Sequence, residues 1–101
     1  MTITQLKYVL AVAEHKNFTL AADKCFVTQP TLSMQVKKME EELGVMIFDR
    51  TRQPVIPTEI GKVVIEQARK ILMEAKRIEW LPANQNAALS LRQIDVNLLR
   101  R

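Results

Sequence analysis

Residues 19–44 place the strongest constraint on the fold, because they hold two short runs of helical spacing separated by a break. The first run is expected to form a helix over about 19–25, with Thr19 at or near its cap. The chain of 101 residues has only 2 glycines and 4 prolines, which favours helices over the many tight turns of an all-β protein. Small side chains at Ala21 and Ala22 would let a neighbouring helix approach closely. The stretch predicts a helix, a turn and a second helix.

The second run carries its own start and stop signals. Thr28 can cap a helix, Pro30 suits its first turn, and Gly44 is typical of the position just after a helix. Apolar residues recur between these signals at steps of four, three and four, at Leu32, Val36, Met39 and Leu43. We therefore predict a helix with one buried stripe between Thr28 and Gly44.

The opposite face of this second helix is largely polar. At 100° per residue, the side chains opposite the buried stripe are those of Pro30, Met34, Lys37 and Glu41. Thr31, Ser33 and Lys38 flank them. Hydroxyl and amide groups suit base edges, whereas ammonium groups suit phosphates. The acidic run 40–42 is expected to be solvated and to repel phosphate. Two ordinary packed helices with a solvated face would show the same periodicity, so the pattern alone leaves both interpretations open.

The flanking sequence predicts three further elements, which are a helix over 2–14, a hairpin built from short β-prone runs at 47–48 and 55–56, and a long helix over about 59–80. Thr2 with Gln5 forms a capping-box pattern at the first helix, and Thr58 can cap the long one. The resulting order, three helices followed by a hairpin, is that of a winged helix-turn-helix. The fold class expected is therefore mainly α.

The long helix has apolar residues at near-heptad spacing, at Ile60, Val64, Ala68, Ile71, Ala75 and Ile78. Such a seam indicates pairing with another helix. Packing within the chain is the simpler explanation. We favour dimerisation, because the seam continues past any core that three short helices can supply.

In a winged helix-turn-helix the second helix of the pair lies in the major groove of DNA. The residues expected to contact DNA from the two helices and the hairpin are Thr19, Thr28, Gln29, Pro30, Thr31, Ser33, Met34, Lys37, Arg50 and Arg52. Arg50 and Arg52 belong to the basic hairpin. Met34 can contact only apolar groups, such as a thymine methyl.

Charge and composition narrow the function less than the motif does. The net charge is +4, but residues 1–58 carry only +1, so bulk charge does not single out a DNA-binding segment. The lone Cys25 cannot form an internal disulfide and is expected to be inert core. No metal, cofactor or catalytic pattern is recognised, so we expect no enzyme. Lacking a signal peptide or membrane span, the chain is expected to be cytoplasmic.

Residues 1–80 resemble the N-terminal DNA-binding domain of LysR-type transcriptional regulators. The resemblance is carried by "LKYVLAVAEHKNFTLAAD" (6–23), "VTQPTLSMQVKKMEEELGVMIFDR" (27–50) and "PTEIGKVVIEQARKIL" (57–72), and the wording is most similar to the OxyR branch. It implies a winged helix-turn-helix, a linker helix that forms an antiparallel dimer, and binding to partly palindromic bacterial promoters, which would place the chain at the bacterial nucleoid. It places Gln29, Pro30, Thr31 and Ser33 at the start of the recognition helix.

The resemblance divides the chain into a winged helix-turn-helix at 1–58, a dimerisation helix at 59–81 and a tail at 82–101. The tail is expected to be disordered or a remnant of an effector-binding domain, which the chain is expected to lack together with any small-molecule effector site. The expected partners are double-stranded DNA and a second copy, as a homodimer or higher oligomer. The alternative is an interaction module that pairs with full-length relatives through the linker helix and modulates them.

Overall fold

The structure is a computed structural model that describes the backbone of residues 1–99 and the side chains of residues 1–92. Its elements are α1 (Ile3–His15), α2 (Phe18–Lys24), α3 (Gln29–Leu43), β1 (Phe48–Asp49), β2 (Ile56–Pro57), α4 (Glu59–Trp80), the 3-10 helix η1 (Leu81–Asn84) and α5 (Gln85–Leu99). The prediction of a mainly helical winged helix-turn-helix with a following long helix is confirmed. None of the helices in the described part of the chain is both long and apolar enough to cross a membrane.

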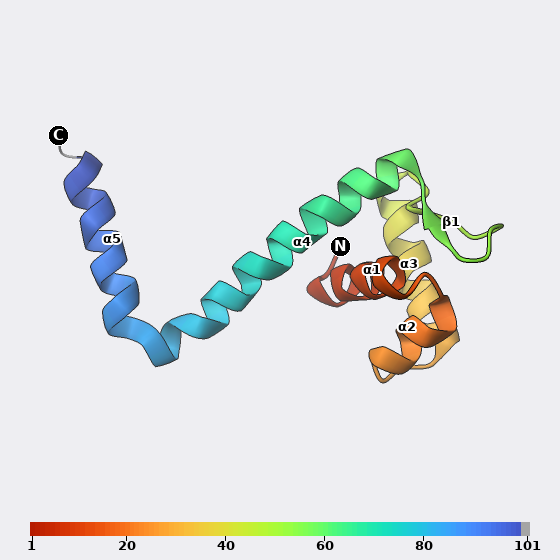
Figure 1. Cartoon of the computed structure of the whole chain (residues 1–101), viewed down its shortest axis with the longest axis horizontal. Helices are drawn as coiled ribbons and strands as arrows, with labels where there is room; N and C mark the ends of the chain where they lie inside the picture. Colours follow the sequence, from red (N-terminus) through yellow and green to blue (C-terminus); the bar gives the residue numbers. More distant parts are fainter. Residues whose placement is uncertain (100–101) are drawn as a thin grey trace.

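The elements form a body and an arm, and the arm consists of α4, η1 and α5 (Figure 1). The body contains α1, α2, α3 and the β1–β2 hairpin, in which the two strands are antiparallel. α4 starts beside the hairpin, packs against α1 and then leads away from the body. The chain bends at η1, and α5 runs in a new direction, so the molecule measures 55 × 28 × 22 Å.

The core of the body is shared by all of its helices, the hairpin and the first half of α4. Its buried apolar residues are Leu6, Val9, Val12, Ala21, Ala22, Leu32, Val36, Met39, Ile47, Phe48, Val55, Ile65 and Ala68. The predicted stripe of α3 is therefore buried, except for Leu43, which is 43% exposed. Periodicity gives the direction of a side chain but not how far its neighbours extend, and Leu43 lies in the last turn of α3.

Side-chain caps begin the helices of the body. Thr2 and Gln5 form the predicted capping box of α1, and Thr28 and Thr58 cap α3 and α4 as predicted. The helix predicted over about 19–25 is present as α2, but its cap residue is not Thr19. Asn17 caps this helix, with its Oδ1 accepting from Leu20 N at 2.8 Å, and the helix begins one residue before Thr19.

The loop before β1 approaches α4 at Gly61 more closely than a side chain at that position would allow. A Cβ at Gly61 would lie 1.9 Å from the carbonyl oxygen of Ile47. The same carbonyl accepts from Thr58 N at 2.9 Å, so the loop before β1 is tied to the α4 cap. Glycine is required here by close approach and not by an unusual dihedral angle.

Two further expectations are corrected by the structure. Cys25 was expected inside α2 as core, but it is the C-cap residue of this helix and is only half-buried. Its partial burial still raises the pKa of the thiol. The tail was expected to be disordered or a remnant of an effector-binding domain; residues 85–99 are not disordered but form α5, and their origin as a remnant stays a prediction. Apolar residues of the tail such as Leu89 have helical spacing, and Leu89 is exposed on α5.

Candidate nucleic-acid interface

The first turn of α3 is built around two threonine side chains. Thr28 Oγ1 accepts from Thr31 N at 3.3 Å and donates to Thr31 Oγ1 at 2.8 Å. These bonds satisfy one amide at the start of the helix and fix both side chains. Gln29 and Pro30 follow the cap directly and are exposed. The start of α3 thus presents an amide side chain and two hydroxyl groups to solvent.

The rest of the predicted face of α3 is also open. Met34 is 60% exposed, and Lys37 and Lys38 are exposed as well. Ser33 is half-buried, at the border between this face and the hairpin. A helix with its side chains fits the width of the DNA major groove, about 12 Å. The face therefore has the size and the polar groups that groove binding requires.

A hollow of about 250 Å³ lies beside the start of α3. It brings together four of the residues predicted for DNA contact, which are Thr19, Gln29, Ser33 and Arg50. The remaining lining residues are Asn17, Phe18, Gln53 and Val55. Most of these side chains carry hydrogen-bonding groups, and no carboxylate lines the hollow. Segments that are far apart in the sequence thus converge on one polar concavity.

Arg50 lies at the base of the hairpin, where its side chain packs against the body and is 30% exposed. Its Nη1 donates to Ser33 Oγ at 3.1 Å, and its Nη2 donates to Glu40 Oε1 at 2.9 Å. The guanidinium carbon also lies 4.6 Å from the centre of the Phe18 ring, which is a cation–π geometry. Arg50 therefore connects α2, α3 and the hairpin.

Glu40 was expected on a solvated acidic face, and this expectation was wrong. Only 4% of the residue is exposed. Its Oε2 accepts from the backbone amides of Ile47 at 2.7 Å and Phe48 at 3.4 Å, while Oε1 accepts from Arg50. A carboxylate can be buried when its oxygens are paired in this way. Glu41 and Glu42 are exposed, as expected for the rest of the run.

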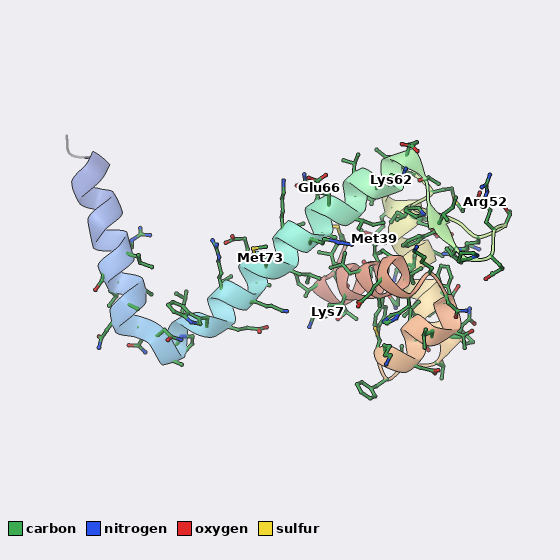
Figure 2. All side chains as sticks on the ribbon, in the orientation of Figure 1. Lys7, Met39, Arg52, Lys62, Glu66 and Met73 are labelled. Carbon is green, nitrogen blue, oxygen red and sulfur yellow. The ribbon has the colours of Figure 1, made fainter. Side chains whose placement is uncertain are left out.

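The second arginine of the hairpin has a different environment. Arg52 has a side chain that is 69% exposed and lies at the end of the hairpin that points away from α4 (Figure 2). Its Nε is 3.6 Å from Asp49 Oδ2. The pKa of Asp49 is lowered, first by the Thr51 hydroxyl, which donates to Oδ1 at 2.6 Å, then by the Thr51 amide and by the charge of Arg52. Arg52 is free to turn toward an outside anion.

One edge of the predicted seam of α4 packs against the body, and the other edge is exposed. Ala68 is fully buried against the body, so it belongs to the packing within the chain, as does Ile65, which the seam did not include. Val64 and Ala75 are half-buried, and Val64 packs against the core. The remaining members, Ile60, Ile71 and Ile78, are exposed in this chain.

Three residues of this region were missed by the sequence reasoning. Asn17 and Gln53 line the polar hollow, and Glu40 anchors Arg50. Asn17 was recognisable as a cap, because asparagine is among the strongest N-cap residues. Nothing in the local sequence indicated the other two, since their roles depend on contacts between α3 and the hairpin. Among the described side chains, no three His, Cys, Asp or Glu residues are grouped as a metal site would need.

Comparison with known proteins agrees with this architecture. Residues 3–62 match the family of bacterial regulatory helix-turn-helix proteins called the lysR family. The chain is 47% identical over 90 residues to the hydrogen peroxide-inducible genes activator of Dickeya chrysanthemi, covering 89% of this chain and 30% of that protein. It is 44% identical over 90 residues to the DNA-binding transcriptional dual regulator OxyR of Escherichia coli K12, with the same coverage. The chain thus spans less than a third of the length of these curated relatives.

Solved structures give the same assignment. The DNA-binding domain of BenM, in complex with catB site 1 DNA, is similar with a TM-score of 0.81 and 34% identity, over 87% of this chain and 95% of that one. Full-length OxyR of Pseudomonas aeruginosa gives a TM-score of 0.79 and 44% identity, over 82% of this chain and 28% of that one. Fold, sequence and site geometry agree, and the chain belongs to the LysR family of bacterial regulatory helix-turn-helix proteins.

Proposed function

We propose that this chain binds double-stranded DNA sequence-specifically, as a dimer, and so regulates transcription. The observation that carries the proposal is the exposed polar start of α3 beside the hollow that gathers Thr19, Gln29 and Ser33. The BenM DNA-binding domain, which is similar over 95% of its length, forms complexes with DNA, and this supports the proposal. α3 then enters the major groove, and the hairpin follows the backbone.

Base reading is assigned to the first turn of α3. The Gln29 amide can pair bidentately with adenine, a contact that discriminates by about 1–3 kcal/mol. Thr31 and Ser33 supply hydroxyl groups on the same part of the helix. Lys37 is exposed one turn after Ser33, where an ammonium group can approach a phosphate. Thr19 and Thr28 place hydroxyl groups at two helix starts, where phosphate oxygens are commonly bound.

A salt titration of two variants tests this division of roles. The probes are a duplex selected from a random-sequence pool by the unmodified chain and a scrambled version of it. Gln29→Ala should weaken binding to the selected duplex far more than to the scrambled one, with the salt dependence nearly unchanged. Arg52→Ala should weaken both and reduce the slope of log affinity against log salt by about one per lost phosphate contact. Equal losses on both duplexes for Gln29→Ala would remove it from base reading.

Dimerisation is supported by the uncovered apolar stripe of α4. Ile60, Ile71 and Ile78 follow one line along this helix, and all three are exposed in the single chain. Exposed large apolar side chains that recur along one row of a helix mark an interaction site more often than an isolated one does. A second α4 would cover this row, which extends over most of the helix.

A matched pair of substitutions on α4 tests the interface. Ile71→Asp places a carboxylate in the proposed contact and should produce monomers, because an unpaired buried charge is unfavourable. Met73→Asp is the control, since Met73 is also exposed but lies on the opposite side of α4. Sedimentation equilibrium should show dimers at micromolar concentration for the unmodified chain and for Met73→Asp. A monomeric unmodified chain would contradict the proposal.

The same stripe supports a second candidate function, which is pairing with a longer relative through α4. In that case the chain acts by forming mixed dimers and binds little DNA by itself. Gel-shift titration of the chain alone separates the two candidates, because only the first expects DNA binding without a partner. Met34, whose thioether is only a weak hydrogen-bond acceptor, is exposed at the centre of this face and is the structural feature that favours the second candidate.

A further inference from the structure

We propose that Arg50 is a positioning residue for DNA reading, which acts through Ser33 and the hairpin and does not bind phosphate through its own charge. This inference rests on the function proposed above and assigns a mechanism to one part of the same interface. It also separates two arginines that the sequence presents as equivalent, since Arg50 and Arg52 stand two residues apart in the same hairpin.

The first argument is the number of directions from which Arg50 is held. One guanidinium nitrogen donates to Ser33 and another to Glu40, at 3.1 and 2.9 Å, and the Phe18 ring lies against the guanidinium face. Phe18 in turn packs edge-to-face on Phe48, with ring centroids 6.0 Å apart. An arginine with these contacts cannot swing toward a passing phosphate without breaking several of them at once.

The second argument concerns charge. Arg50 lies beside the Glu40 carboxylate, which is almost fully buried and therefore poorly screened by water. The pair contributes little net charge to the surface that would face DNA. Arg52 differs, because its side chain is mostly exposed and its acidic neighbour Asp49 is 3.6 Å away. Of the two arginines, Arg52 has the geometry of a phosphate contact.

The third argument is what Arg50 does to Ser33. A serine hydroxyl can accept hydrogen bonds and has one proton to donate, whereas a guanidinium group can only donate. Because Arg50 donates to Ser33 Oγ, the Ser33 proton must go to an acceptor other than Arg50. Ser33 lines the polar hollow at the start of α3, so its hydroxyl is set as a donor on the DNA-facing side. Acceptors such as guanine N7 and O6 fit such a donor.

The fourth argument links the same residue to the hairpin. Glu40, which holds Arg50, also accepts from the amides of Ile47 and Phe48 at the start of β1. One buried carboxylate therefore joins α3, the first strand and the arginine that follows it. Changing Arg50 should alter both the donor at Ser33 and the angle of the hairpin relative to α3.

The decisive variant is Arg50→Lys, which keeps the positive charge but cannot hold the planar set of contacts. We expect the ratio of affinities for the selected and scrambled duplexes to fall by about tenfold, which corresponds to the loss of one directed contact. The slope of log affinity against log salt should stay unchanged, because no phosphate contact is lost. Arg52→Lys is the matched control and should keep the affinity ratio.

Coupling between Arg50 and Ser33 is tested by a double-mutant cycle with Ser33→Ala. If Arg50 acts through Ser33, the affinity ratio of the double variant should be no lower than that of the more affected single variant, because both changes remove the same contact. Additive losses would overturn the proposal. So would an unchanged affinity ratio in Ser33→Ala, which remains informative if Arg50→Lys fails to fold, since alanine is favourable within a helix.

The test distinguishes failure of the inference from failure of the proposed function. If no duplex from the random pool is preferred by the unmodified chain, sequence-specific binding itself is wrong. If the unmodified chain discriminates but Arg50→Lys keeps the affinity ratio, only the positioning role is wrong. A reduced salt slope in Arg50→Met, which removes the charge, would show that Arg50 binds phosphate directly and would also overturn the inference.

Discussion

The body and the arm of this molecule use apolar residues in opposite ways. In the body, apolar side chains from three helices, the hairpin and the first half of α4 meet in one core. Between residues 73 and 92, where the side chains of the distal arm are described, the large apolar side chains are exposed, at Met73, Ile78, Trp80, Leu81, Leu89 and Leu91. The apolar side chains of the body and of the first half of α4 therefore cover one another, whereas those of the described distal arm are exposed in the single chain.

The junction between the two regions is at the start of α4. There Thr58 accepts from Gly61 N at 3.0 Å and its own amide donates to Ile47. These contacts connect the arm to the hairpin that carries Arg50 and Arg52. If α4 pairs with a second copy, the spacing of two α3 helices on DNA is therefore set through rigid contacts at this junction.

The largest expected effect is a contrast in stability between core and arm. Phe48→Ala should lower the free energy of unfolding by about 3–5 kcal/mol, because it removes a fully buried ring. Leu91→Ala, on exposed α5, should change it by less than about 0.5 kcal/mol. Urea unfolding at low protein concentration measures both. Similar losses of unfolding free energy for the two variants would mean that Leu91 on α5 is buried against another part of the chain.

The next effect is expected at the junction. Gly61→Ala should destabilise the chain by about 1–3 kcal/mol, because the added methyl group would overlap the Ile47 carbonyl and push the hairpin away from α4. Val63→Ala, at an exposed position of the same helix turn, is the control and should stay within about 0.5 kcal/mol. Thermal unfolding of the two variants is sufficient. A neutral Gly61→Ala would show that the hairpin moves away without cost.

A smaller loss of stability is expected when the cap of α2 is removed. Asn17→Ala should cost about 1 kcal/mol, since it leaves the Leu20 amide without its side-chain acceptor. Thr19→Ala should have almost no effect on stability, because Thr19 is already inside the helix. Urea unfolding compares the two variants, and a larger loss for Thr19→Ala would identify Thr19 as the cap.

In η1 of the arm, no side chain forms a hydrogen bond that caps the start of the helix. Backbone hydrogen exchange should therefore be faster in η1 than in α2.

The smallest expected effect is at the hairpin tip, which is part of the body but as exposed as the arm. The pKa of Asp49 is lowered by hydrogen bonds from Thr51 and by the nearby Arg52 charge. A lowered pKa in the folded state means that this contribution to stability is present above the usual pKa of aspartate and is lost as the pH falls through the folded-state value. Thr51→Val should raise the pKa of Asp49 in an NMR titration. No change would remove the hydroxyl as its main cause.

Much of the local structure of the body was predictable because its signals are local. Thr2, Thr28 and Thr58 were identified as caps from sequence, and each caps the expected helix. The hairpin was predicted from two β-prone runs, and its strands lie one residue later in the chain. These features depend on a few neighbouring residues, so spacing and residue type are enough to find them.

The errors fall where burial depends on distant segments. Leu43 continues the stripe of α3 in sequence but is exposed, while Glu40 lies in an acidic run and is buried. Ala68 has the spacing of an intermolecular seam but packs on the body. In each case periodicity gave the orientation of the side chain, and the neighbouring element decided whether anything covers it.

The sequence by itself determined the starts of α1, α3 and α4, the order of elements from α1 to α4 and the family to which the chain belongs, because caps, periodicity and sequence motifs all lie within short stretches of the chain. Only the tertiary structure decided the different roles of Arg50 and Arg52. The two arginines stand two residues apart in the same hairpin, but one lies beside Glu40, Ser33 and Phe18 and the other is mostly exposed. A charge held by partners from other elements is fixed and partly neutralised, whereas an exposed charge remains mobile, and that difference exists only in three dimensions.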